Sequence, residues 1–198
     1  MILLSSFSAS QYLSEGKKLI DEGIISLLPQ GEVYPESIHE AMRYSLLAGG
    51  KRLRPILVMA ASEAIGGDRH SVLPFAVAAE MIHTYTLIHD DLPALDNDDL
   101  RRGKPTNHKV FGEAIAILAG DALLTQAFII MTRAVGMENI PPDYILKATH
   151  EMACALGSTG MIGGQVVDLE SEGKPITKET LEYIHVYKTG FLIKACIR

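Results

Sequence analysis

Cysteine and basic residues are scarce in this chain of 198 residues, and each scarcity excludes a class of protein. The two cysteines, Cys154 and Cys196, are too few for a disulfide scaffold, and they form no C-x-x-C pair for zinc. This usage favours a reduced, cytoplasmic setting. The 18 basic residues are outnumbered by 24 acidic ones, which gives a net charge of −6. Because nonspecific nucleic-acid binders usually carry a basic excess, we expect no nucleic-acid partner.

Uninterrupted hydrophobic runs are also few. The apolar start, residues 1–4, is short and has no basic stretch before it, so it does not resemble a targeting signal. The longest apolar segment, residues 114–131, contains Gly120, Asp121 and Gln126, and its polar groups would be costly in lipid. We therefore expect a buried helix there and no stable membrane insertion. Hydrophobic residues make up 47% of the chain, which excludes extended disorder.

Apolar residues recur at steps of three and four along most of the chain, and strand signals are nearly absent. Glycines and prolines mark the helix ends, with Ser71 as a candidate N-cap and Gly136 as a candidate helix end. We predict helices over residues 9–28, 37–47, 54–65, 71–92, 113–135, 141–156, 160–171 and 177–198. A single all-α domain over residues 1–198 is the simplest interpretation. The one long connection, residues 93–112, is polar, and such loops are often functional.

The sharpest motif lies at the end of the apolar helix predicted over residues 71–92. The aspartates that fall within ten residues are Asp90, Asp91, Asp96, Asp98 and Asp99. Carboxylates this close repel one another, and Mg²⁺ relieves the repulsion while leaving coordination positions for phosphate oxygens. Arg101 and Arg102 follow, and guanidinium groups bind phosphate through paired hydrogen bonds. The motif predicts a metal-assisted site for a phosphorylated substrate. The alternative interpretation, a solvated acidic loop, would not explain why the aspartates follow an apolar helix or why two arginines come directly after them.

Further polar residues are candidates for the same site, although simple packing or a basic helix start would explain each one alone. Lys51 and Arg54 share a face if the turn after Gly49-Gly50 is helical. His83 lies seven residues before Asp90, nearly two helical turns, and therefore on the same face. The remaining candidates are Tyr85 and Thr86 near the acidic motif, Gln165 and Asp168 after a glycine pair, and Lys188 and Thr189 in the last predicted helix.

In order and spacing these motifs resemble the short-chain trans-prenyl diphosphate synthases, and most closely the bacterial farnesyl and geranylgeranyl types. The matching stretches are residues 49–55, 80–83, 90–104, 165–168 and 188–189. The resemblance implies an isoprenoid-synthase-type helical bundle around a deep central cavity. It also implies a prenyltransferase that condenses isopentenyl diphosphate with dimethylallyl or geranyl diphosphate. Family members use Mg²⁺, with Mn²⁺ as a substitute, and are commonly homodimers.

The resemblance further implies a role for each candidate residue. It makes Asp90 and Asp96 magnesium ligands, with Asp91 supporting them. It places the allylic diphosphate against Arg101, Lys188 and Thr189. It places the isopentenyl diphosphate against Lys51, Arg54, His83 and Arg102. It makes Gln165 and Asp168 part of the polar wall on the allylic side.

Product length can be argued from helix geometry. A growing prenyl tail should run along the helix away from Asp90, and Tyr85 lies about 7.5 Å from it at the helical rise. A bulky ring there, with Thr86 beside it, should stop elongation early. In the family, an aromatic at this position, together with two extra residues in the acidic motif, resembles the farnesyl type. We therefore predict mainly farnesyl diphosphate, with geranylgeranyl diphosphate as the alternative.

The family has a second aspartate-rich motif that has no counterpart after Lys188. We therefore expect a C-terminally truncated form, and whether it is active alone stays open. Three other functions also stay open. They are a non-catalytic partner subunit of a prenyl synthase heteromer, a metal-dependent phosphohydrolase built on His89 and Asp90, and a plain helical interaction module.

Overall fold

The computed structural model describes residues 8–134 and 140–198, and helices dominate both ranges, as predicted. The helices of the first range are α1 (Ala9–Leu27), α2 (Glu36–Leu46), α3 (Leu53–Ala64), α4 (Leu73–Asp90), α5 (Asn107–Phe111) and α6 (Glu113–Arg133). Those of the second are α7 (Pro142–Leu156), α8 (Met161–Ser171), α9 (Lys178–Ile184), the π-helix η1 (His185–Gly190) and α10 (Phe191–Cys196). Two short strands, β1 (Leu100–Arg101) and β2 (Lys104–Pro105), pair antiparallel between α4 and α5.

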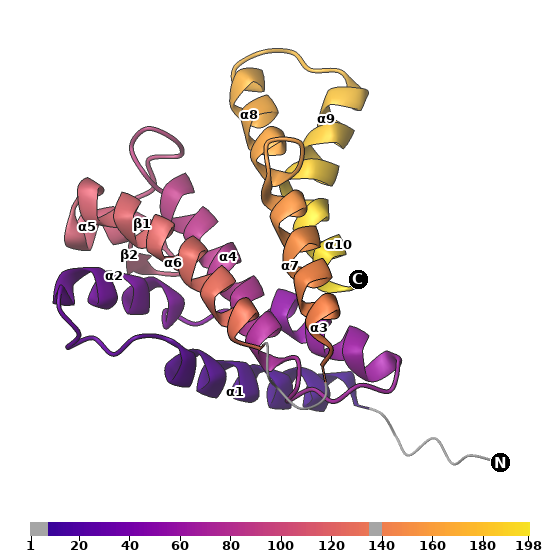
Figure 1. Ribbon diagram of the computed structural model, residues 1–198. Coiled ribbons are helices and arrows are strands. Elements are labelled where there is room, and N and C mark those ends of the chain that lie inside the picture. The colour runs from indigo at the N-terminus through magenta and orange to yellow at the C-terminus, as the bar shows by residue number, and fades with distance from the viewer. Residues whose placement is uncertain (1–7, 135–139) are drawn as a thin grey trace.

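The central element is α4, which packs against α1, α2, α3 and α6 (Figure 1). Every residue from Ala76 to Ile82 is buried, as expected of a helix surrounded by other helices. Its main neighbour, α6, presents small residues such as Ala116, Ala119 and Gly120 on its buried face. This packing fixes the direction in which α4 carries its C-terminal aspartates out of the core.

The long apolar segment forms α6, and the expectation of a buried helix holds for one face only. Ile117, Leu118 and Ile129 on this helix are exposed. Among the described residues, α6 alone is long and apolar enough to cross a membrane by length and composition, and 39% of its apolar window is buried. The core helix of a folded domain passes the same test of length and composition. The packing of α6 against α4 is that of a core helix on one face.

Several predicted helix ends differ from the observed ones. The Ser71 N-cap is wrong, because Val72 occupies that position and Ser71 instead donates to the Asp68 carboxylate from its backbone N–H (2.9 Å) and its hydroxyl (3.2 Å). The turn after Gly50 is not helical, since α3 begins at Leu53 and Arg52 has a left-handed φ of 52°. The predicted helix end at residues 135 and 136 lies outside the described residues.

The predicted C-terminal helix is divided. It starts as α9, widens into the π-helix η1 over residues 185–190 and continues as α10. The segment α8 packs against η1, and a Cβ added at Gly164 would lie 2.2 Å from the backbone nitrogen of Lys188. The absence of a side chain at this glycine therefore permits the close approach of the two helices. Single π-helical turns are frequent at functional sites, and this one contains Lys188 and Thr189.

Candidate active site

The acidic motif folds back on the end of α4. Asp90 is the last residue of that helix and Asp91 is its C-cap. The backbone N–H of Asp96 donates to the carbonyl of Asp90 at 2.8 Å, and Asn97 adopts a left-handed φ of 52° to complete the turn. Two carboxylates six residues apart are thereby returned to the same end of one helix.

Asp90 carries the strongest electrostatic signal of this acidic group. Burial raises its pKa to about 6, the negative charges of Asp96 and Asp91 add to the rise, and Lys188 and Arg101 oppose it. Within the described ranges, its carboxylate accepts no hydrogen bond. A half-buried carboxylate that lacks a hydrogen bond and faces a second carboxylate is a favourable place for a cation.

The donor set fits Mg²⁺ if substrate supplies the remaining ligands. Among residues 8–134 and 140–198, no group of three or more His, Cys, Asp or Glu side chains is placed to hold a metal ion. Magnesium commonly binds through one or two carboxylates together with phosphate oxygens and water. Asp90 and Asp96 match that mode, whereas a cage built from protein side chains alone does not.

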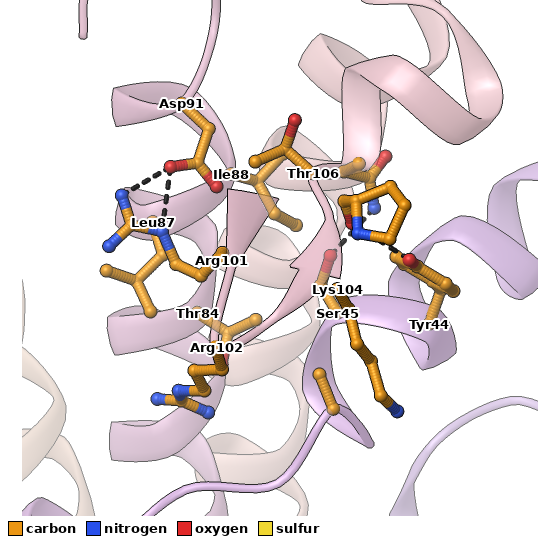
Figure 2. Close-up of a pocket in the computed structure, with 13 residues that line it drawn as sticks. Tyr44, Ser45, Thr84, Leu87, Ile88, Asp91, Arg101, Arg102, Lys104 and Thr106 are labelled. Atoms are coloured by element: carbon orange, nitrogen blue, oxygen red, sulfur yellow. Dashed lines mark hydrogen bonds and ion pairs between the residues drawn. The ribbon is translucent and has the colours of Figure 1, made fainter. Parts of the chain in front are cut away.

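Asp91 points to a different partner. It is only 3% exposed, and its Oδ1 accepts hydrogen bonds from Arg101 Nε at 2.7 Å and from Arg101 Nη2 (Figure 2). Arg101 also bonds to Asp98 at 3.1 Å. Asp91 lines a small pocket between α2, α4 and the β1–β2 pair, together with Arg101 and Lys104. The structure thus joins Asp91 to Arg101, and the supporting metal role implied for it stays a prediction.

The allylic-side candidates converge from α8 and η1. Lys188 Nζ lies 2.5 Å from Asp168 Oδ2. Burial works against the charge of Lys188, but the hydrogen bond to Asp168 and the charges of Asp168, Asp90 and Asp96 shift its pKa upward. Lys188 therefore lies close to Asp168 on α8 and close enough to the acidic motif to interact with Asp90 and Asp96. Gln165 is half-buried one turn before Asp168, and Thr189 is exposed.

A second, basic group surrounds His83. Burial, together with the positive charges of Arg54, Arg102, Arg101 and Arg52, lowers the pKa of His83 to about 3. The imidazole is therefore neutral at physiological pH. Arg54 is partly buried, and its Nε has no hydrogen-bond partner. A buried guanidinium donor without a partner, in a cluster of positive charges, points to an anionic ligand.

Two basic motifs that are far apart in sequence meet at this cluster. Arg102 donates from Nη1 to the carbonyl of Gly49, and a Cβ on Gly50 would lie 2.6 Å from the same guanidinium. The left-handed φ values of Gly50 (137°) and Arg102 (54°) allow this contact. Lys51 is exposed beside it. The structure thus brings together the Arg54, His83 and Arg102 candidates.

Sequence reasoning missed Arg52. This residue is 3% exposed, and its guanidinium donates to Glu80 (2.7 Å), Asp21 (2.8 Å) and the carbonyl of Leu46 (2.8 Å). Its position between Lys51 and Arg54 gave no local indication that its guanidinium would be buried. The available signal was the acidic Glu80 within an otherwise apolar helix segment, which requires a buried partner.

Tyr85 and Thr86 lie on α4 between the two charged groups. Tyr85 is 6% exposed, and its hydroxyl has no hydrogen-bond partner. Its ring packs edge-on against His89, at 5.8 Å between centroids. Burial and the charge of Asp90 raise the pKa of Tyr85 to about 12. Thr86 donates to the carbonyl of His83 at 2.8 Å. The tail-stopping role of Tyr85 and the deep cavity stay predictions.

The structure is thus a helical protein in which one central helix ends in carboxylates, and guanidiniums from neighbouring segments surround an earlier part of it. The chain belongs to the polyprenyl synthetase family, whose model matches residues 35–198. This finding confirms the resemblance inferred from the motifs.

Individual relatives agree with the family. The chain is 52% identical over 194 residues to the heterodimeric geranylgeranyl pyrophosphate synthase large subunit 1, chloroplastic, of Arabidopsis thaliana, which covers 96% of this chain and 52% of that protein. It is 51% identical over 191 residues to the farnesyl diphosphate synthase of Geobacillus stearothermophilus, with coverages of 96% and 64%. A geranyltransferase structure from Legionella pneumophila superposes with a TM-score of 0.90 at 40% identity, over 95% of this chain and 66% of that one. The chain thus spans from about half to about two thirds of the length of these relatives.

Proposed function

We propose that the chain acts in a trans-prenyltransferase that condenses isopentenyl diphosphate with an allylic diphosphate, mainly to farnesyl diphosphate. One observation carries the proposal. The helix α4 ends in the carboxylates of Asp90 and Asp91 and, about 10 Å earlier at the helical rise, carries the neutral His83 ringed by guanidiniums. A reaction between two diphosphate substrates needs two separate regions that bind them, one through a metal held by carboxylates and one through guanidiniums.

The residues divide the work between the two substrates. Lys188, Arg101 and Thr189 hold the allylic diphosphate and stabilise the negative charge that develops as the C–O bond breaks. Mg²⁺, when bound at Asp90 and Asp96, supplies further neutralisation of that leaving group. Gln165 and Asp168 complete the polar wall, with Asp168 orienting Lys188 through their ion pair.

The basic group holds the second substrate. Arg54 and Arg102, with Lys51, bind the diphosphate of isopentenyl diphosphate, and the neutral His83 donates a hydrogen bond to it. The double bond of this substrate attacks the allylic cation and forms the new C–C bond. A proton then leaves, and the released diphosphate accepts it. Water must be kept out, since it would quench the cation.

Tyr85 is the proposed limit on chain length. Tyr85→Ala should lengthen the product beyond C15, because the ring that stops the tail is removed. Tyr85→Phe is the matched control, since the hydroxyl has no partner to lose and the ring stays. Products are dephosphorylated and separated by chain length. Unchanged C15 product from Tyr85→Ala would refute the role of the ring.

The parent chain is tested with Mg²⁺, geranyl diphosphate and labelled isopentenyl diphosphate. A C15 product that EDTA abolishes supports the proposal. Release of inorganic phosphate from simple phosphate esters, without chain extension, would favour the phosphohydrolase instead. A folded chain that neither binds the substrates nor joins them would overturn the proposal.

Geranylgeranyl diphosphate is the second candidate product. The relatives from Arabidopsis thaliana and Cyanophora paradoxa, at 52% and 49% identity, carry geranylgeranyl synthase names. A dominant C20 product in the same assay would select this candidate. We also propose a homodimer, supported by the exposed apolar side chains of α6, and sedimentation equilibrium at the monomer mass would refute it.

A further inference from the structure

Arg52 holds together the turn from which the basic group arises. Its guanidinium reaches three helices at once, through Asp21 on α1, the Leu46 carbonyl at the end of α2 and Glu80 on α4. The ion pair with Glu80 is almost completely buried, with side chains 1% and 3% exposed. A buried arginine whose hydrogen bonds run to three separate helices fixes their relative positions tightly.

The same residue sets the backbone at the start of α3. Arg52 is the N-cap of this helix, and its carbonyl accepts the first helical hydrogen bond, from Ile56 N–H at 3.1 Å. Its left-handed φ of 52° is uncommon for a residue other than glycine and persists only where the surroundings enforce it. The contacts with Glu80 and Asp21 supply that enforcement. Lys51 and Arg54 therefore leave the chain in directions that Arg52 determines.

We propose that the Arg52–Glu80 ion pair is a positioning element for the isopentenyl diphosphate region, acting through Lys51 and Arg54. The inference rests on the proposed function and adds to it two residues that need not touch substrate. Glu80 lies three residues before His83, so the pair anchors the turn against the stretch of α4 that carries the imidazole. The negative charge of Glu80 also favours the charged form of Arg54 and so opposes the lowering of the Arg54 pKa by burial.

The effect should be confined to one substrate. Glu80 precedes Asp90 by ten residues, about 15 Å along the helix axis. Arg52 makes no hydrogen bond or ion pair with Asp90, Lys188 or Asp168 within the described residues. A change in the ion pair should therefore weaken isopentenyl diphosphate binding and leave the allylic diphosphate region intact.

The test compares two mild variants of the pair with a matched control. Arg52→Lys keeps the charge and loses the three-way fork, and Glu80→Gln keeps the shape and loses the charge. Arg69→Lys is the control, because Arg69 forms an equally short ion pair with Glu63 (2.6 Å) away from the site. For each folded variant, calorimetry measures the affinity for isopentenyl diphosphate and for geranyl diphosphate separately. Where the parent turns over, the two KM values and kcat are measured as well.

We expect Arg52→Lys and Glu80→Gln to weaken isopentenyl diphosphate binding about tenfold, while geranyl diphosphate affinity changes less than about threefold. Arg69→Lys should leave both affinities unchanged. Equal losses for the two substrates, or unchanged affinities with only a lower melting temperature, would overturn the positioning role. Should both variants fail to fold, Asp21→Asn removes the charge of the outermost partner of Arg52, along with the ion pair of Asp21 to Lys17. This variant must then weaken isopentenyl diphosphate binding selectively. A folded parent that binds neither substrate would refute the proposed function itself. The experiment thus distinguishes a failure of the positioning role from a failure of the proposed function.

Discussion

The neutral His83 should make the stability of the chain sensitive to acid. Burial and four neighbouring guanidiniums lower its pKa from 6.5 to about 3 in the folded state. The unfolded chain then binds the proton more readily, so stability is fully present above pH 6.5 and is lost as the pH falls toward the folded pKa. Between about pH 7.5 and about pH 5 the loss from this one group is about 2 kcal/mol.

Urea denaturation of the parent and of His83→Gln at the two pH values measures this loss. The difference between the two proteins isolates the effect of His83, because the other titrating groups are the same in both and contribute equally to the loss of stability. The parent should lose about 2 kcal/mol more than His83→Gln on acidification. The same substitution at the exposed His185 controls for the loss of a histidine outside the basic group. The parent and His83→Gln would contradict a neutral, buried imidazole if their losses of unfolding free energy on acidification agreed within about 0.5 kcal/mol.

Two glycine substitutions test the close contacts of the site. Gly164→Ala should cost about 3 kcal/mol, since its Cβ would lie 2.2 Å from the η1 backbone, whereas Gly190→Ala meets nothing nearer than 3.5 Å and should cost little in the same urea experiment. Gly50→Ala should weaken isopentenyl diphosphate binding by displacing Arg102, while Gly49→Ala, with a similarly positive φ and nothing within 4 Å, should only lower stability. Equal binding by the two variants would contradict the contact.

Local patterns were sufficient for most of the fold. The recurrence of apolar residues at steps of three and four predicts the positions of α4 and α6 in the sequence. It does so because α6 buries one continuous face and the middle of α4 is buried on all sides. The position of the acidic motif followed from the same pattern, since Asp90 stands at the end of the apolar run. The family resemblance needed no tertiary information, because it rests on the order and spacing of motifs along the sequence.

Long-range pairs could not be predicted in this way. The contact between Arg102 and Gly49 spans 53 residues, and the bond between Arg52 and Glu80 spans 28. Each depends on how helices pack, and the sequence has no local pattern that encodes it. The π-helical turn around Lys188 was missed for a similar reason. The turn packs against α8, while the apolar period of the sequence continues on either side of it as in a regular helix.

Opposite charge requirements at two points of one helix explain why α4 is the organising element. At its C-terminus the helix dipole is negative, so Asp90 and Asp91 stand where carboxylates are least favourable and need cations. Arg101 meets that need for Asp91, and Lys188 meets it only in part for Asp90 because it also pairs with Asp168. At His83 the imbalance is reversed, with guanidiniums in excess of carboxylates. A metal at the first point and a diphosphate at the second would each remove an uncompensated charge. Binding the two substrates should therefore stabilise the chain as well as orient the reaction.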